Sequence, residues 1–367
     1  MLPSSLRGRD VIVTRFVPLV GFLLLSFLGF YVCLTILQDA PRRRTRKLDI
    51  QAHRGGRANT IENTLPSFAW GLINGASTLE LDNGITKDGV VVVWHDQSIT
   101  DEKCQDTTPA FEGDPDFPYI GKYIVNLTLA QIKTLDCGSK RLHDFPLQLT
   151  YPGTRISTLK ELFDFAKCAD PEHKVQWNIE SKINASHPDR THDVDMFVTK
   201  QYEAFVESSY PLSQIIYQSL DWRTLIAMKK LDPRIKTSAL ISPTTLSTAN
   251  GTTSPWQAGI RIGDLPGPSV DVKIADGAQS VQADILSPAV GLGSTPFTTR
   301  AMIERARELD MQVIPWTVND LATIEQLVEW GTDGVITDHP GEVRRWAWQQ
   351  GYGTGLKYAS DVLRCLA

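Results

Sequence analysis

Cysteine is scarce in this 367-residue sequence, and its few copies form no metal-binding pattern. The chain has 5 cysteines, with no CxxC pair and no cluster of cysteine with histidine, so nothing suggests a structural zinc site. Five scattered cysteines are also too few for a disulfide framework. Cys104 and Cys137 lie in one loop-rich stretch, and the sequence leaves open whether they pair or stay buried thiols.

An excess of positive charge is missing as well. The formal net charge is −5, whereas a nucleic-acid-binding protein normally presents a basic face to the phosphates. We therefore expect no nucleic-acid partner, and any anionic substrate must be met by local positive groups or a bound metal. With 22% charged and 42% hydrophobic residues, and without repeats or low-complexity tracts, the composition is that of a folded globular chain.

One long uncharged run stands apart from this composition. Residues 16–37 carry no charge, and as a helix they would reach about 33 Å, enough to span a bilayer. The apolar core of a secretory signal is shorter, about 7 to 15 residues, and no small-x-small cleavage site follows. The run therefore predicts a single N-terminal transmembrane helix, between a tail of residues 1–15 and a basic linker of residues 38–48. A cleaved signal peptide is the alternative.

The side of the membrane is left undecided by the sequence. Three arginines precede the run and five basic residues follow it at positions 42–47, a bias that favours a cytoplasmic C-terminal part. Sequons at Asn126, Asn184 and Asn250, and a pairing of Cys104 with Cys137, would favour the opposite side. We therefore expect a single-pass membrane protein of the endomembranes or the cell surface.

Apolar runs alternate with amphipathic helical patterns over residues 49–346, which is typical of repeated βα units around a parallel sheet. Nine strands are predicted, at residues 51–53, 79–82, 90–95, 175–180, 215–219, 237–241, 284–287, 313–317 and 335–337. Helices are predicted at residues 64–74, 127–135, 158–168, 193–207, 222–231, 298–309 and 321–330. A closed barrel has eight strands, so at least one of the nine is wrong or lies outside it. The short connection from Asp82 to Val90 allows either an extended return or a hairpin.

Two insertions interrupt the alternation, at residues 97–151 and 242–277. Loops this long in a compact domain are usually binding loops or lids. Residues 347–367 form a C-terminal tail, which reads as a loosely attached end from Gly351 onward.

Acidic side chains sit at strand ends where a packed barrel would otherwise carry valine. Glu80 and Asp82 are two apart on one strand, and Asn178, Glu180 and Lys182 follow the same period on another, so each set shares a face. Carboxylates this close repel one another unless a cation or a shared proton compensates. Oxygen ligands without cysteine favour magnesium, calcium or manganese over zinc.

Two histidines and an arginine complete this candidate site. His53 and His95 end two further strands, and imidazole suits proton transfer near neutral pH. Arg54 offers a planar fork for a phosphate oxygen. Each motif alone has an ordinary structural explanation. Because all of them end apolar runs, they gather at one rim of a barrel, and together they favour a metal-dependent phosphoester site.

These motifs occur in the order of a known family. The run HRG, ENT, ELD, TKDG and HD, followed by STLKELFDFA, NIESK, PWTVND and DGVITDHP, resembles the glycerophosphodiester phosphodiesterase family from about residue 50 to residue 341. The resemblance implies a TIM (β/α)8 barrel that hydrolyses glycerophosphodiesters to glycerol 3-phosphate and an alcohol, using a divalent cation.

The resemblance also implies roles for individual residues. It assigns the metal to Glu80, Asp82 and Glu180, catalysis to His53 and His95, phosphate binding to Arg54 and Lys182, and supporting roles to Glu62 and Trp316. Trp316 could equally be a barrel-packing indole. Two other functions stay open: a lysophospholipase D-like enzyme acting on membrane lysolipids, and a membrane-tethered barrel that binds phosphodiesters without turning them over.

Overall fold

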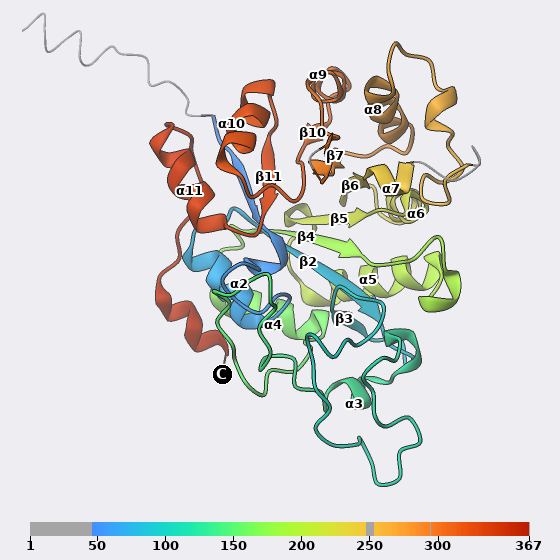
Figure 1. Cartoon of the computed structure of the whole chain (residues 1–367), viewed down its shortest axis with the longest axis vertical. Coiled ribbons are helices and arrows are strands. Elements are labelled where there is room, and N and C mark those ends of the chain that lie inside the picture. The colour runs from blue at the N-terminus through green and yellow to red at the C-terminus, as the bar shows by residue number, and fades with distance from the viewer. Residues whose placement is uncertain (1–45, 247–252, 294, 367) are drawn as a thin grey trace, which may run out of the picture. The chain divides into compact units, whose positions relative to one another are not determined.

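The computed structural model describes residues 46–246, 253–293 and 295–366, and these form a parallel barrel with helices on its outside (Figure 1). The barrel strands are β1 (Asp49–Ala52), β2 (Thr78–Ile85), β4 (Gln176–Ser181), β5 (Ile215–Ser219), β6 (Lys236–Ile241), β7 (Ile285–Pro288), β10 (Gln312–Val313) and β11 (Gly334–Thr337). The main helices are α2 (Leu65–Ile73), α4 (Leu159–Ala169), α5 (Val194–Ser208), α6 (Trp222–Leu231), α8 (Val270–Ser280), α9 (Arg300–Glu308), α10 (Leu321–Trp330) and α11 (Pro340–Gln349). Shorter elements are the 3-10 turn η1 (His53–Gly55), the helices α3 (Leu129–Ile132) and α7 (Pro243–Leu246), and a small hairpin of β8 (Gly291–Leu292) and β9 (Thr295–Pro296).

The strands follow one another around the barrel in the order β10, β7, β6, β5, β4, β2, β1 and β11. Backbone hydrogen bonds join the two outer members of this series: Asp333 N donates to Val313 O at 3.0 Å, and Ile336 N donates to Pro315 O at 2.9 Å. These bonds bring the sheet back onto itself. The predicted barrel fold is confirmed.

One of the nine predicted strands, at residues 90–95, lies outside the barrel: it is β3 (Val91–Val93), which forms an antiparallel hairpin with β2. Thr86 Oγ1 accepts a hydrogen bond from Val90 N at 2.9 Å, and Gly89 supplies the positive φ of +79° that the tight turn needs. Of the two connections left open by the sequence, the hairpin is therefore right. The chain returns to the barrel rim, where Trp94 N donates to Asp82 O at 3.0 Å.

Two apolar layers hold the barrel. A small cluster inside it consists of Ile216, Ile285, Ile314 and Ile336, with Trp316 packed against it. A larger layer between strands and helices includes Trp177, whose ring centroid lies 5.7 Å from that of Phe68 in an edge-to-face contact. The polar side chains at the barrel rim therefore lie over an apolar layer inside the barrel.

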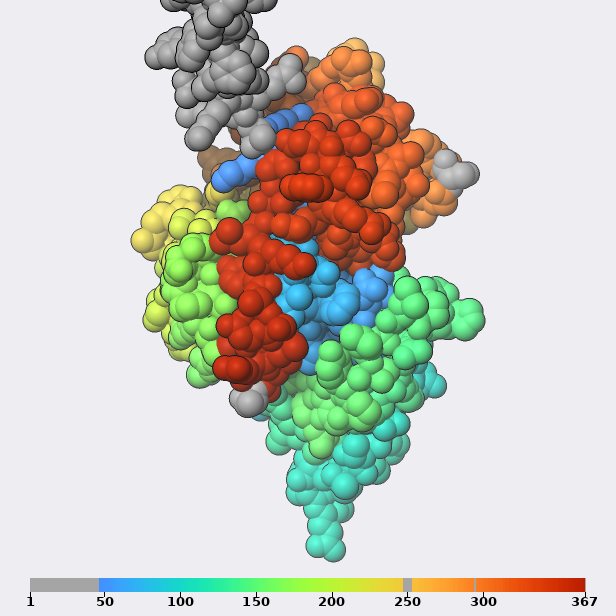
Figure 2. Space-filling model, turned by 90° about the vertical axis from the view of Figure 1, so that its left-hand side faces the viewer, coloured from blue at the N-terminus to red at the C-terminus, as the bar shows by residue number. Residues whose placement is uncertain are grey.

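The first predicted insertion, residues 97–151, is a folded extension that projects from the barrel (Figure 2). It has its own core, in which Trp94, Ile99, Tyr119 and Leu127 are buried. A disulfide joins Cys104 to Cys137. The pairing that the sequence left open therefore occurs, and it ties the two ends of this extension together.

The second predicted insertion, residues 242–277, is partly wrong, because α8 occupies residues 270–280 and is the barrel helix between β6 and β7. The sequence did not predict this helix, because small residues occupy positions of α8 where larger apolar side chains would give a clear amphipathic pattern. A Cβ on Gly277 would lie 2.3 Å from Ile262 Cδ1, so this glycine lets Ile262 pack closely while it weakens the helical pattern. Helix α11 was missed too, since Pro340 and Gly341 open it.

The prediction of a loosely attached C-terminal tail is wrong. A disulfide joins Cys365 to Cys168 in α4, and Tyr358 Oη donates to Asp170 Oδ1 at 2.7 Å. The last segment, η7 (Ser360–Leu366), contacts α2 and α4 and runs across the surface in red in Figure 2. The expectation that the cysteines form no disulfide framework is also wrong, since two disulfides are present. Nothing in the sequence indicated the second one, because its cysteines lie 197 positions apart and no local pattern marks such a pair.

The predicted transmembrane helix, residues 16–37, lies outside the described residues. Within the ranges that the structure describes, none of the helices has the length and apolar character needed to cross a membrane.

We expect the double variant Cys168→Ser/Cys365→Ser to lose about 2–5 kcal/mol of unfolding free energy, because the bridge closes a long loop. Urea unfolding followed by circular dichroism would measure this, with exposed Ser360→Ala in the same segment as control. Peptide mapping without reductant would detect the bridge directly. An unchanged unfolding midpoint would show that the bridge contributes nothing to stability.

Candidate active site

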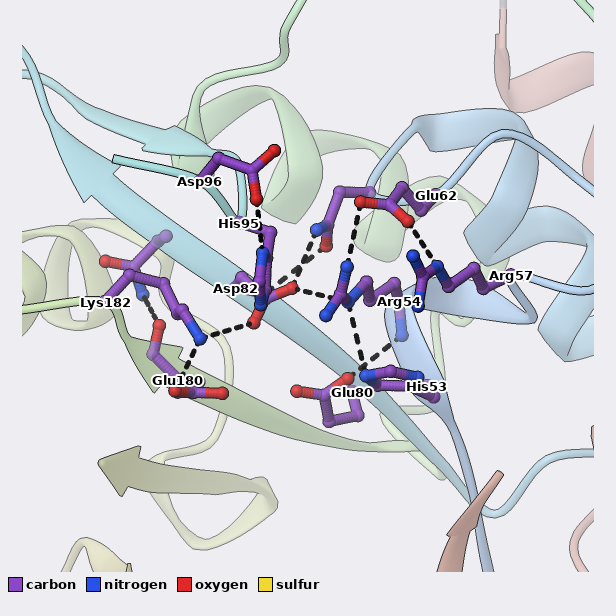
Figure 3. Close-up of polar contacts among 12 residues, drawn as sticks. His53, Arg54, Arg57, Glu62, Glu80, Asp82, His95, Asp96, Glu180 and Lys182 are labelled. Carbon is purple, nitrogen blue, oxygen red and sulfur yellow. Dashed lines mark hydrogen bonds and ion pairs between the residues drawn. The ribbon is translucent and has the colours of Figure 1, made fainter. Parts of the chain in front are cut away.

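Three carboxylates converge at the carboxyl ends of two neighbouring strands. The register of β2 and β4 places Glu80 opposite Asn178 and Asp82 opposite Glu180, and alternate residues of a strand share one face. One carboxylate oxygen from each of Glu80, Asp82 and Glu180 lies within 4.8 Å of the others, and no member is more than 8% exposed. Figure 3 shows these side chains pointing toward one another. Such an all-oxygen cluster suits a hard divalent cation.

The electrostatics of the cluster point the same way. Burial, together with the negative charges of Asp82 and Glu180, raises the pKa of Glu80 well above its ordinary value. Burial raises the pKa of Glu180 to about 7, against the opposing charge of Lys182. Burial also opposes the charge of Asp82, but His95 and the cations Arg54 and Lys182 outweigh it and lower the pKa of Asp82. A divalent cation would supply the positive charge that ionisation of all three requires.

Arg54 connects the carboxylates to the loop after β1. Its backbone N donates to Glu80 Oε2 at 2.9 Å. Its guanidinium donates to Glu62 Oε1 at 2.9 Å and lies 3.2 Å from Asp82 Oδ2. The next residue, Gly55, has φ +87°, and a Cβ there would lie 2.3 Å from Ser67 Oγ. Only glycine fits this turn, which aims Arg54 into the cluster.

Asn63 holds Asp82 from the other side. Its amide nitrogen donates to Asp82 Oδ2 at 2.8 Å, and its carbonyl oxygen accepts from Asp82 N at 3.2 Å. Lys182 Nζ lies 2.9 Å from Glu180 Oε1 and 3.8 Å from Asp82 Oδ1. Every carboxylate of the cluster is therefore positioned by at least one neighbouring donor.

Each candidate histidine is oriented by a carboxylate. His53 Nδ1 lies 2.6 Å from Asp338 Oδ1, and His95 Nδ1 lies 2.7 Å from Asp96 Oδ1. A carboxylate only accepts, so we assign the proton to Nδ1 in both rings, which leaves Nε2 as an acceptor; that of His53 accepts from Arg54 Nε at 3.2 Å. Asn319 Nδ2 donates to the second oxygen of Asp338 at 2.7 Å. Burial and the neighbouring Lys182 ammonium lower the pKa of His95 to about 4, so its ring is neutral at pH 7.

Lys103 bridges the two halves of the site. Its Nζ lies 2.8 Å from Glu62 Oε1 and 2.6 Å from Asp96 Oδ2, and it sits over the Trp94 ring, 5.5 Å from the centroid. Glu62 positions Arg54, and Asp96 positions His95. Lys103 therefore couples Arg54 to His95, and it is the residue next to the disulfide-bonded Cys104.

The structure brings all the sequence-predicted charged residues together but leaves Trp316 in a packing position. The Trp316 indole nitrogen donates to Ser287 O at 2.8 Å, and its ring packs on the interior isoleucines. Five residues that orient the site were missed: Asn63, Asp96, Lys103, Asn319 and Asp338. Asn319 and Asp338 follow predicted strands, so the rule that identified His53 could have identified them. Lys103 gave no signal, because it lies in a loop.

A cavity of about 390 Å³ opens beside the cluster and is lined by residues that include His95, Glu180 and Lys182. A larger cavity, about 530 Å³, lies at the other end of the barrel, among residues such as Asp49 and Gln176 at the starts of strands and Gly355 of the C-terminal segment. The smaller cavity is the one that adjoins acids, bases and cations, and active sites of such barrels lie at the carboxyl ends of the strands.

The fold and this rim of paired acids, histidines and cations define a barrel hydrolase of the phosphoric diester class. Residues 53–342 match the model of the Glycerophosphoryl diester phosphodiesterase family, and the chain belongs to that family. It is a phosphoric diester hydrolase, as the resemblance in sequence implied.

Individual relatives extend over most of the barrel. A glycerophosphodiester phosphodiesterase of Caldanaerobacter subterraneus subsp. tengcongensis is 28% identical, over 79% of this chain and 93% of its own length. The human lysophospholipase D GDPD1 is 22% identical, over 88% of this chain and 96% of its own. A phosphodiesterase from Oleispira antarctica, solved with the product sn-glycerol-3-phosphate, has a TM-score of 0.56 at 19% identity, covering 81% of this chain and 95% of that one.

We expect Lys103→Met to lower kcat about 10- to 100-fold, because a second layer of contacts orients the groups that act. Lys103→Arg should recover part of the loss, since it restores the charge. Lys133→Met is the matched control. Lys133 lies in the same extension as Lys103, but it pairs with Glu161 of α4 away from the site. Steady-state kinetics with thermal melts would separate this effect from misfolding. A wild-type kcat in Lys103→Met would contradict a role of the Lys103 contacts in orienting the site.

Proposed function

We propose that the chain hydrolyses glycerophosphodiesters to glycerol 3-phosphate and an alcohol, with a divalent cation held by Glu80, Asp82 and Glu180. The observation that carries the metal assignment is the approach of three buried carboxylate oxygens to within 4.8 Å. Magnesium or calcium fits an all-oxygen donor set best, and manganese is the next choice. When bound, the cation would polarise a phosphoryl oxygen.

The chain's own residues supply the remaining chemistry. Arg54 and Lys182 would hold phosphoryl oxygens, since both already lie against the carboxylates that bind the metal. One of His53 and His95, unprotonated at Nε2, would take a proton from the nucleophile, which is water or the neighbouring glycerol hydroxyl; attack by the hydroxyl would give a cyclic phosphate that water then opens. The other ring, as an imidazolium that also carries a proton at Nε2, would give that proton to the leaving alcohol. Asp338 and Asp96 would hold the Nδ1 proton of each ring and so orient it.

We expect the full chain to release glycerol 3-phosphate from glycerophosphocholine, and His53→Ala and His95→Ala each to lower kcat by about 10²- to 10⁴-fold, the usual contribution of a positioned acid or base. An enzyme-coupled assay of glycerol 3-phosphate would measure both. His143→Ala is the control, because the His143 side chain is 99% exposed. Full turnover in either histidine variant, with an unchanged melting curve, would remove that histidine from the mechanism.

Chelation with EDTA should abolish turnover, and added magnesium or calcium should restore it. Metal binding needs Glu80 and Glu180 ionised, yet their pKa values in the metal-free chain are raised, that of Glu180 to about 7. Affinity should therefore weaken as pH falls through 7, and binding should release protons. Calorimetry in two buffers of different ionisation enthalpy would count them. Full activity in EDTA would refute the metal assignment.

A lysophospholipase D-like activity is the second candidate function, favoured by the relative of that name and by the anchor predicted at residues 16–37. Comparing glycerophosphocholine with lysophosphatidylcholine as substrates would separate the two activities. A barrel that only binds phosphodiesters would release no choline from either compound.

For the location, we propose a single-pass membrane protein whose barrel lies in an oxidising compartment, in an endomembrane lumen or at the cell surface. Two disulfides support that side, as does the sequon at Asn126, which is exposed. Asn184 is only 7% exposed and its side chain is engaged by the backbone, and Asn250 lies outside the described residues. Thiol trapping of the protein in its own cells would test this; four free thiols would contradict it.

A further inference from the structure

The cavity beside the catalytic cluster has an outer wall that the proposed chemistry leaves unused. Its inner wall carries His95, Glu180 and Lys182, and its outer wall carries Tyr123, Arg190 and Trp256. Tyr123 comes from the extension after His95, and Arg190 from the loop after β4. A substrate whose phosphate reaches Lys182 would extend one of its two ester groups into this space.

The outer wall is preformed. The segment of Tyr123 pairs with the chain just after the catalytic histidine, where Ile124 N donates to Gln97 O at 2.8 Å. The loop that carries Arg190 is held by Asn184, whose Oδ1 accepts from the backbone nitrogens of Ser186 and His187, both at 2.9 Å. A ligand would therefore meet a wall that needs little ordering on binding.

Among the charged side chains that line the cavity, Arg190 is available to bind a ligand because it has no acidic partner in the described residues. Its guanidinium lies over the Tyr123 ring, 5.7 Å from the centroid, and among residues 46–246, 253–293 and 295–366 no carboxylate lies within ion-pair distance of it. The two acids of the cavity are already paired: Asp96 with Lys103 at 2.6 Å, and Glu180 with Lys182 at 2.9 Å. The wall thus presents an unneutralised positive charge.

This arrangement disfavours a quaternary ammonium group. Proteins bind such groups on open aromatic faces, and here the face of Tyr123 is covered by a guanidinium that repels cations. A guanidinium carries its N–H groups in its own plane, where they can donate to a carboxylate or a phosphate. The glycerol end of the substrate is small and uncharged, and it gains nothing from an unpaired arginine.

We propose that this cavity selects the alcohol of the glycerophosphodiester, and that Arg190 makes the enzyme prefer alcohols carrying a negatively charged group over choline. The inference rests on the proposed function and concerns only its substrate preference. It also gives the extension after His95 a role in recognition, since Tyr123 holds the arginine in place.

The test uses the full chain and three substrates that share the glycerol phosphate moiety: glycerophosphoinositol 4-phosphate with an anionic alcohol, glycerophosphoglycerol with a neutral one, and glycerophosphocholine with a cationic one. Release of glycerol 3-phosphate gives kcat/KM for each. We expect kcat/KM to fall in that order, with at least about a tenfold difference between the first and the last, as for one good charged contact.

Substitutions at Arg190 should change the ratio of kcat/KM for the anionic substrate to kcat/KM for glycerophosphocholine. Arg190→Gln should lower kcat/KM for the anionic substrate about tenfold and raise it for glycerophosphocholine, because an attraction and a repulsion are both removed. Arg190→Glu should reverse the order, whereas Arg190→Lys should keep it. Arg300→Gln is the matched control, because Arg300 is an exposed, ion-paired residue of α9.

The outcomes separate the two proposals. If no substrate releases glycerol 3-phosphate in the presence of metal, the proposed function fails. If the substrates are turned over but choline is preferred, or Arg190→Gln leaves the ratio unchanged, the preference is overturned and the function stands. Arg190→Lys keeps the test decisive should the glutamine variant melt early, since it must retain the wild-type order.

Discussion

The mutual repulsion of three buried carboxylates governs the arrangement of this barrel rim. Glu80, Asp82 and Glu180 face one point because β2 and β4 are in register, and charges of one sign are kept together in an apolar interior only by opposite charge. Below them, Asn178 donates to the side chains of Gln51 and Gln218 at 2.7 and 2.8 Å. A polar layer thus replaces the branched residues that would pack such an interior most tightly. The barrel is less stable for it, and the same polar side chains support a binding site.

Part of the site is supplied by the hairpin and the extension that follow β2 and lie outside the barrel. The β2–β3 hairpin carries His95 back to the rim, and the extension that follows adds Lys103, Tyr123 and the bridged Cys104. The barrel therefore provides the carboxylate cluster, and the extension orients a histidine and shapes the cavity. A single insertion can in this way alter substrate choice without disturbing the carboxylates.

The sequence was sufficient for those parts of the site that depend on strand periodicity. Spacing of two placed Glu80 with Asp82, and strand ends located His53 and His95, because both rules follow from backbone geometry alone. It was insufficient where distant segments meet. Lys103 and Arg190 lie in loops whose paths depend on tertiary contacts, Cys168 and Cys365 pair across most of the chain, and α8 was hidden by its small residues.

The position of Asp338 along the chain has a consequence for the order in which the site is completed during synthesis. The three clustered carboxylates and both histidines precede residue 182, but the carboxylate that orients His53 follows β11, the strand that pairs with β1. A nascent chain that has not yet reached Asp338 can hold the acids but cannot fix this imidazole. The site is therefore completed only after β11 has paired with β1.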